Sequence, residues 1–319
     1  IRQTNFIKKN IANISEGSRK ISAISAIILS GLVFREYYNN YKIGLKELKK
    51  LIEDFFDKNG VPKNRNFENL VIYAQYFVLI KEWIKIGQED VPDYLEEIIE
   101  KNLICLNSLN NPLKKLPLFN GSTEKNLENF FHYLTKLNYS LNKNLKSVAE
   151  IQIIKNKKST LYFDSGEPPI DKLSKDYQSG PLSFEYSNDN HKIITNCGYG
   201  RKISKKIQLL SKFTSAQSTL CINNTSVVKF KRNHVINKAY GSTINNSFKI
   251  FDFDRTEDKT NIIVSATHDA YLDNFGYLHK RTIKFFKKNN DLIGNDNLIK
   301  KNGSSNIDFC IRFHLYPGI

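Results

Sequence analysis

Residues 180–224 decide how this chain folds. They read GPLSFEYSNDNHKIITNCG over 180–198, continue through a basic connector, and end as SAQSTLCINN over 215–224. The first part alternates large and polar side chains, breaks at 187–190 and resumes as KIIT over 192–195, which predicts a β-hairpin. A further strand is expected over 218–222. These three strands would bring Gln178, Asn196 and Gln217 towards one end of a sheet.

The hydrophobic period changes along the chain. Apolar residues recur at helical spacing in five segments, at 18–34, 43–56, 67–86, 94–109 and 123–137. From about residue 145 the period becomes two, and short strand-like runs alternate with Asn, Asp and Gly clusters. This pattern predicts an α+β protein of two domains, with helices over 1–140 and an antiparallel β-sandwich over 146–319.

Composition narrows the classes of function. The chain has 319 residues and a formal charge of +16. Lys is spread along the sequence without a DNA or RNA motif, so no specific nucleic-acid partner is expected, although a surface that favours polyanions stays open. The longest apolar run, over 21–34, fits a buried helix better than a membrane span, so no transmembrane segment is expected in this stretch. Because the chain contains no Met, we interpret it as a fragment of a longer protein.

The four cysteines are isolated in the sequence. None has CxxC spacing, and each lies in an apolar context, so they are expected to be buried thiols. Cys197 and Cys221 belong to segments that the predicted sheet brings together, which leaves a disulfide between them open.

An ordered series of motifs resembles one known family. The series comprises LSFE at 182–185, NCG at 196–198, STLCIN at 218–223, THDAY at 267–271, FGYLHKR at 275–281 and RFHLYP at 312–317. It is similar to the C-terminal half of the heparinase II/III-like proteins, which are polysaccharide lyases built from an α/α toroid and an antiparallel β-sandwich. The resemblance implies a partial toroid over 1–140, truncated at its N-terminus, and a C-terminally truncated sandwich over 146–319.

The resemblance also implies a site, from which this sequence departs. The family's His-x-His-x-Asp run falls on 176–180, so the position of the catalytic base is Asp176. Gln178, Asn196 and Gln217 fall on the three positions that hold zinc in the family. Carboxamides are poor zinc ligands beside imidazole or carboxylate. We therefore expect no metal and no cofactor.

Other polar residues remain as candidates for chemistry. His268, Tyr271 and Tyr177 join Asp176 as catalytic candidates, because a lyase needs a base and an acid. The candidates for substrate binding are Arg19, Arg65, Gln178, Asn196, Gln217, His279 and Arg281. A structural alternative stays open, in which His268 and Asp269 form a hydrogen-bonded loop pair and Arg281 faces an acidic neighbour in the sandwich.

The function implied by the resemblance is β-elimination on an acidic, uronate-containing polysaccharide, with a degenerate metal site. The alternative is a non-catalytic protein that keeps the lyase fold to bind an acidic glycan or to serve the cell envelope. The resemblance favours the periplasm or the envelope as the location and leaves the cytoplasm open.

Overall fold

The computed structural model describes residues 1–14, 17–231, 242–302 and 306–318. Two compact units make up the chain. The first contains residues 1–63, 67–108 and 128–144, and the second contains 64–66, 109–127 and 145–319. Each unit is described by itself.

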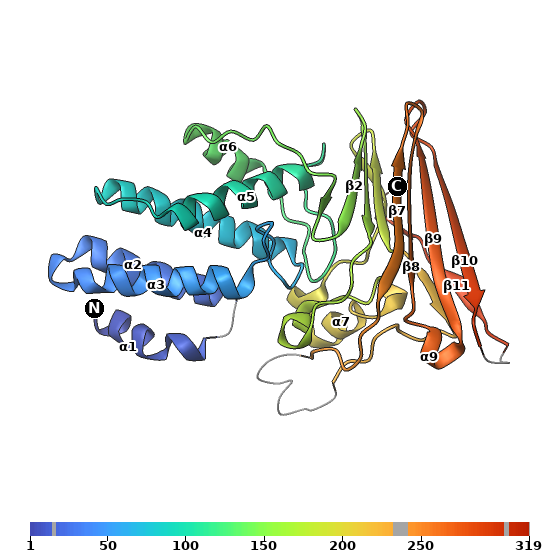
Figure 1. Ribbon diagram of the computed structural model, residues 1–319, viewed down its shortest axis with the longest axis horizontal. Coiled ribbons are helices and arrows are strands. Elements are labelled where there is room, and N and C mark those ends of the chain that lie inside the picture. Colours follow the sequence, from blue (N-terminus) through green and yellow to red (C-terminus); the bar gives the residue numbers. More distant parts are fainter. Residues whose placement is uncertain (15–16, 232–241, 303–305, 319) are drawn as a thin grey trace. The chain divides into compact units, whose positions relative to one another are not determined.

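The first unit is helical (Figure 1). Its helices are α1 (Arg2–Asn10), α2 (Ser18–Val33), α3 (Tyr38–Phe55), α4 (Phe67–Ile86), α5 (Asp93–Leu109) and α6 (Glu128–Lys136), with 3-10 turns η1 (Ile11–Asn13) and η2 (Arg35–Tyr37). Helices α2 and α3 pack closely because glycines lie at their contact. A Cβ atom on Gly31 would lie 2.2 Å from the backbone nitrogen of Tyr41, and one on Gly44 would lie 2.5 Å from Cγ1 of Ile28.

The predicted helices are found, and two of their bounds differ by more than one residue. Helix α3 begins at Tyr38, five residues before the expected start. Helix α6 begins at Glu128 and not at residue 123. The preceding residues fold back on one another instead: Leu116 N–H donates to the carbonyl of Lys125 (3.1 Å), and Leu127 N–H donates to that of Lys114 (2.8 Å). These hydrogen bonds use backbone groups that a longer helix would need.

The second unit is built on antiparallel sheets (Figure 1). A six-stranded sheet has the order β1-β2-β3-β4-β5-β12, a four-stranded sheet the order β10-β9-β8-β7, and β6 pairs with β11. The strands are β1 (Ser147–Val148), β2 (Ile151–Lys155), β3 (Ser159–Asp164), β4 (Phe184–Asn188), β5 (His191–Thr195), β6 (Leu220–Ile222), β7 (Ile250–Glu257), β8 (Asn261–His268), β9 (Tyr277–Phe286), β10 (Leu292–Lys300), β11 (Phe309–Ile311) and β12 (His314–Leu315). Short helices lie between them, namely η3 (Asp171–Asp176), η4 (Gly200–Lys202), α7 (Lys205–Leu210), η5 (Thr214–Ala216) and α9 (Leu272–Phe275).

One apolar core joins the two larger sheets. Leu161 and Phe163 of β3 are fully buried against Val264 of β8 and Phe285 of β9. Burying each such side chain contributes about 1.5–3 kcal/mol relative to leaving it in water. The sequence alternates on β9, where buried and partly exposed residues follow one another, as expected for a strand with one face on a core.

The predicted hairpin over 184–195 is confirmed as β4 and β5. The strand expected over 218–222 is shorter, and its expected place in the same sheet is wrong, because β6 pairs with β11. Strand β12 occupies the edge of β5 instead. Ser218 is held to the end of β5 by single hydrogen bonds: its N–H donates to Asn196 Oδ1 (2.9 Å) and its hydroxyl donates to the carbonyl of Thr195 (2.6 Å).

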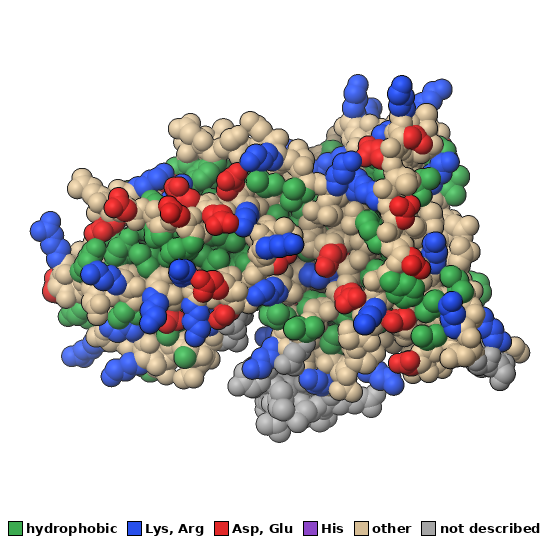
Figure 2. Space-filling model, viewed as in Figure 1, with side chains coloured by type: hydrophobic (Ala, Val, Ile, Leu, Met, Phe, Trp, Pro, Cys, Tyr) green, Lys and Arg blue, Asp and Glu red, His purple; other side chains and the backbone are tan. Residues whose placement is uncertain are grey.

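Two surface properties bear on function. Figure 2 shows Lys and Arg side chains scattered over the visible face, with Asp and Glu between them, and without one large basic patch. None of the described helices is both long enough and apolar enough to cross a membrane.

Candidate functional site

Three buried carboxamides converge in the second unit, as the sequence predicts. Gln178 follows η3, Asn196 follows β5 and Gln217 follows η5. Gln178 Nε2 donates to the carbonyls of Gly198 and Ser211, both at 2.8 Å, and Gln217 Nε2 donates to the same Ser211 carbonyl at 2.9 Å. We call Gln178, Asn196 and Gln217 the amide cluster.

The amide cluster joins segments that are distant in sequence. Gln178 Oε1 accepts from Gly121 N–H at 3.0 Å. Asn196 Nδ2 donates to the carbonyl of Leu118 at 3.3 Å, and its Oδ1 accepts from Ser218 N–H. The side chains therefore fasten the 118–121 turn and the residues before β6 to the end of β5.

The amide cluster does not fit a zinc ion. Zinc binds lone pairs on imidazole, thiolate or carboxylate groups. Here the side-chain nitrogens of Gln178 and Gln217 donate to carbonyls, and the side-chain oxygens of Gln178 and Asn196 already accept from backbone N–H groups. Among the described residues, no three His, Cys, Asp or Glu side chains gather in a way that could hold a metal.

Asp176 lies beside the amide cluster and is partly exposed. The Tyr199 hydroxyl donates to Asp176 Oδ1 at 3.0 Å and accepts from Gln208 Nε2 at 2.6 Å. Burial, followed by the Asp176 charge, raises the pKa of Tyr199, so this hydroxyl keeps its proton and orients the carboxylate. Gly121 permits the close approach: it has φ +84°, and a Cβ there would lie 2.6 Å from Cβ of Asp176.

A buried lysine supplies positive charge near Asp176. The Lys212 side chain donates to the carbonyls of Lys175 and Ser242, both at 2.7 Å, and its ammonium lies 4.3 Å from the ring centroid of Phe230. Burial lowers the pKa of Lys212 to about 8, while the charge of Asp176 acts in the opposite direction. The ammonium is thus only weakly stabilised as a cation, and a negatively charged ligand nearby would favour its protonated form.

A hollow of about 360 Å³ opens beside this site. That volume falls within the usual range of ligand sites. Tyr199 and Ser211 connect the hollow to Asp176 and to the amide cluster. It is lined by Cys197, Tyr199, Gly200, Ile203, Ile207, Leu210, Ser211, Ser215 and Ala216. The expectation that every cysteine is buried is wrong, because Cys197 is exposed and Cys310 is partly exposed.

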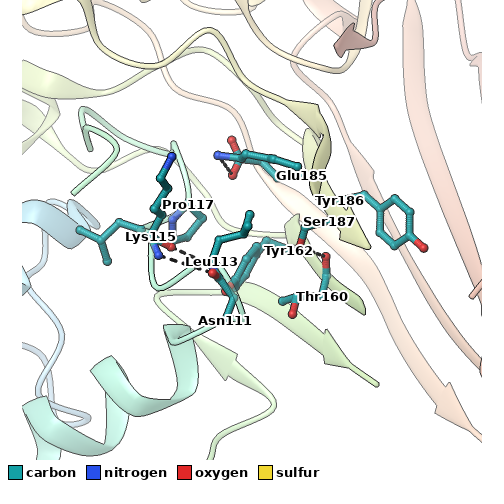
Figure 3. Close-up of a pocket in the computed structure, with 11 residues that line it drawn as sticks. Asn111, Leu113, Lys115, Pro117, Thr160, Tyr162, Glu185, Tyr186 and Ser187 are labelled. Carbon is teal, nitrogen blue, oxygen red and sulfur yellow. Dashed lines mark hydrogen bonds and ion pairs between the residues drawn. The ribbon is translucent and has the colours of Figure 1, made fainter. Parts of the chain in front are cut away.

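A second hollow, between the 111–117 segment and strands β3 to β5, is too small for a sugar (Figure 3). Its volume is about 10 Å³, room for roughly one water molecule. Asn111 Nδ2 donates to the Lys115 carbonyl (2.7 Å) and to the Tyr162 hydroxyl (3.1 Å), and a buried ion pair joins Lys192 to Glu185 (3.0 Å). The hydrogen bond from Asn111 to Tyr162 fixes the turn against the sheet, whereas the ion pair joins the neighbouring strands β4 and β5.

His268 and His279 lie in a buried network. Ala270 N–H donates to His268 Nδ1 (3.2 Å), so Nε2 of the neutral ring carries the proton and donates to His279 Nδ1 (3.0 Å). His279 Nε2 then donates to Asp296 Oδ1 (2.6 Å). The hydrogen bonds that run from Ala270 through both rings to Asp296 are all satisfied only if both histidines are neutral. Burial, the main cause, lowers the pKa of both histidines.

Arg281 completes the network, and the alternative that it faces an acidic neighbour is confirmed. Its Nε and Nη2 donate to the two oxygens of Asp296 at 2.7 and 3.0 Å. Its Nη1 donates to the carbonyls of Leu182 and Ser218, both at 2.9 Å. The His268, His279 and Arg281 side chains are at most 1% exposed. The other part of that alternative, a pairing of His268 with Asp269, is wrong, because Asp269 Oδ1 accepts from Lys249 N–H instead (2.7 Å).

The contacts of the remaining candidates do not involve Asp176. The Tyr271 hydroxyl donates to the carbonyl of Leu220 (3.0 Å), and Tyr177 is 1% exposed. Arg65, also buried, pairs with Asp164 (2.5 Å) and Glu150 (3.2 Å). Arg19 is exposed in the first turn of α2, in the helical unit.

Comparison with known proteins identifies the family. A family model described as heparinase II/III-like, C-terminal, matches residues 143–319, just over half of the chain. The chain belongs to the heparinase II/III-like family. A comparison of this heparinase II/III-like protein with curated proteins found no match.

Solved structures agree on the fold of this heparinase II/III-like protein. The crystal structure of heparinase III is similar over 99% of this chain and 52% of its own length, with a TM-score of 0.73 and 14% identity. A mutant of the heparan sulfate lyase HepC from Pedobacter heparinus is similar over 99% of this chain and 50% of its own, with a TM-score of 0.74 and 13% identity. The chain therefore spans about half the length of these structures, which at such identity establish the fold alone.

Sequence reasoning missed the residues that surround Asp176 in this heparinase II/III-like protein. Tyr199, Gln208 and Lys212 lie in the basic connector, where no motif marked them. Tyr199 directly follows the NCG motif, which was the one available signal. Asp296 was missed as well, because a single acidic residue in an alternating strand is usually exposed.

Proposed function

We propose that this heparinase II/III-like protein is a polysaccharide lyase that acts by β-elimination on an acidic, uronate-containing polysaccharide, with Asp176 as the catalytic base. We infer with it that the helical unit is the last part of an α/α toroid and that the two large sheets form a β-sandwich. The observation that carries the proposal is the Asp176 carboxylate. It is partly exposed, oriented by Tyr199 and close to the charge of Lys212.

The chemistry places demands that these residues meet in part. The base must accept the proton on the carbon next to the uronate carboxylate, and a cation or a hydrogen-bond donor must stabilise the negative charge that develops there. Asp176 has a lone pair available on the oxygen that Tyr199 does not engage. Lys212 supplies positive potential, although its own N–H groups already bind the carbonyls of Lys175 and Ser242.

Of the four catalytic candidates, we propose a direct role for Asp176 alone. His268, Tyr271 and Tyr177 are at most 1% exposed, so the surrounding structure would have to open before a sugar reached them. Their proposed role is to hold the second unit in shape. Among the substrate-binding candidates, Gln178, Asn196 and Gln217 would hold the backbone segments around Asp176 in position. Roles for Arg19, Arg65, His279 and Arg281 in binding stay predictions.

The test is a lyase assay on a panel of uronides. The protein is incubated with heparan-type and alginate-type polysaccharides, and the unsaturated product is followed by its ultraviolet absorbance. Asp176→Asn should lower the rate by about 10²–10⁴, the usual effect of losing a general base. Asp273→Asn, which changes an exposed carboxylate in α9, serves as the matched control. Turnover that survives Asp176→Asn would refute the assignment.

A second candidate function is favoured by the amide cluster. Carboxamides stand at the three positions that the family resemblance gives to zinc, and their hydrogen bonds tie distant segments together. A protein that binds an acidic glycan without cleaving it would need no more than this scaffold and a charge of +16. Retardation of the protein in gels containing an acidic polysaccharide, together with no unsaturated product at any pH, would favour binding over catalysis.

A further inference from the structure

Two cysteines face each other across the smallest sheet. Cys221 of β6 and Cys310 of β11 are direct partners in the antiparallel register. Hydrogen bonds flank the pair on both sides: Asn223 N–H donates to the Asp308 carbonyl (2.8 Å), and Arg312 N–H donates to that of Thr219 (3.1 Å). The register at this position is therefore fixed from both directions.

The geometry of such a pair suits a disulfide. In antiparallel sheets, directly opposite residues have Cα atoms about 4.5–5.5 Å apart, and their side chains project from the same face. Disulfides form between Cα atoms about 4.4–6.8 Å apart. Cys310 Sγ lies 3.8 Å from the Cys221 carbonyl of β6, and Cys221 Sγ lies 3.3 Å from the carbonyl of Thr225, in the turn that follows β6.

The alternative partner, Cys197, has a different environment. It lines the hollow beside Tyr199 and is exposed, and its N–H donates to the carbonyl of Ala216 (3.0 Å). No strand pairing connects it to Cys221, whose register partner is Cys310.

We propose that Cys221 and Cys310 are a disulfide-forming pair that cross-links β6 to β11 when the protein meets a small-molecule disulfide such as oxidised glutathione. The bond closes a covalent ring through residues 221–310, which contain all four strands of the sheet β7 to β10. It also anchors β11 close to the segment that carries Gln217. This modification is independent of the proposed function, because neither thiol belongs to the Asp176 site.

The two thiols have different roles in the reaction. Cys310 is partly exposed and is the first to react, whereas Cys221 is 1% exposed. The Cys310 thiolate attacks one sulfur of oxidised glutathione, forms a mixed disulfide and releases one glutathione thiolate. The Cys221 thiolate then attacks the Cys310 sulfur and displaces the second glutathione. Two electrons pass to glutathione, and the two thiol protons end on the two glutathione thiolates.

Burial controls the second step. It raises the pKa of the Cys221 thiol, and a charge on Cys310 raises it further. The mixed disulfide removes that second effect, because the Cys310 sulfur is then neutral. The exchange should therefore proceed faster at alkaline pH, where more of Cys221 is thiolate.

The experiment compares alkylation of the native protein before and after oxidation. The whole chain is treated with dithiothreitol or with oxidised glutathione, blocked with iodoacetamide, digested and mapped by mass spectrometry. Oxidation should give a peptide pair joined through Cys221 and Cys310, together with a higher urea midpoint than the reduced protein. Cys197, which is exposed, serves as the internal control and should carry glutathione or the alkyl group.

Variants distinguish the pairings. Cys197→Ser should leave the cross-link intact, whereas Cys310→Ser should abolish both the cross-link and the gain in urea midpoint. A cross-link between Cys197 and Cys221 would overturn the proposal. The proposal would also be overturned if Cys197 reacts on oxidation while Cys221 and Cys310 stay as free thiols. The same holds if Cys221 and Cys310 each carry a separate glutathione and no cross-link forms.

Discussion

Replacing Asp296 by Asn should destabilise the second unit more than any surface substitution. Asp296 binds Arg281 through both carboxylate oxygens and also accepts from His279. The Arg281 side chain is 1% exposed and that of Asp296 is 7% exposed. Asparagine removes the negative charge but keeps the size, so the change leaves a buried guanidinium without its counter-charge.

The expected cost is about 3–5 kcal/mol, the usual range when one partner of a buried ion pair is removed. The matched control is Glu257→Gln on β7. Glu257 also has two cationic partners, Lys287 (2.9 Å) and Lys146 (3.1 Å), but its side chain is 34% exposed. Water screens that pair, and the control should cost at most about 1 kcal/mol.

Urea unfolding followed by far-UV circular dichroism measures the effect. The fluorescence of Trp83, the single Trp, reports on helix α4 of the first unit and separates a loss confined to the sheets from general destabilisation. The double variant Arg281→Met with Asp296→Leu should lose less stability than the sum of its single changes, because it leaves no unpaired charge. A loss below about 1 kcal/mol for Asp296→Asn, or strict additivity in the double variant, would refute the reasoning.

Three further changes test other parts of the second unit. Burial lowers the pKa of His268 and His279, so unfolding takes up protons below about pH 6.5. Urea titrations should therefore show the free energy of unfolding falling towards acid pH, by up to about 1.4 kcal/mol per pH unit for each ring. A flat profile from pH 7 to 5 would contradict the neutral pair, and His268→Gln should reduce the slope. Gly121→Ala should lower the melting temperature, at a cost above about 1 kcal/mol, because the new methyl group meets Asp176 at a positive φ. Gln178→Leu should cost about 3 kcal/mol or more in urea unfolding, since it strips partners from several buried backbone groups; a loss under about 1 kcal/mol would mean that the carboxamide is dispensable.

Much of the fold could be predicted from local patterns. Helix α4 has the bounds that its apolar spacing predicts, and the β4–β5 hairpin follows from an alternating run interrupted by Ser, Asn and Asp. These elements depend on residues that are neighbours in sequence, and one side chain period fixes each of them. The end of helix α5 at Leu109 is local as well, because Pro112 has no N–H for a continued helix and disfavours helical backbone in the residue before it.

The site was less accessible from the sequence. The convergence of Gln178, Asn196 and Gln217 was predicted, because each lies in or close to a motif that predicted a strand. The partners of Asp176 and of Arg281 were not, since Tyr199 and Asp296 reach them through folds of the backbone that no local pattern encodes. Burial decided which of the other candidates can reach a substrate. His268 has a side chain of a type common in catalysis, but it lies in the environment of a core residue.

The sequence by itself determined most of the helices, the β4–β5 hairpin and the change from helical to strand periodicity near residue 145. Only the tertiary structure decided that β6 pairs with β11, that Cys221 faces Cys310, and that His268 is shut inside a hydrogen-bonded chain while Asp176 keeps contact with solvent. The physical reason is that side chain period is set by adjacent residues. Strand partners, burial and the charges around a group are set by residues far along the chain, and they exist only once the sheets have packed.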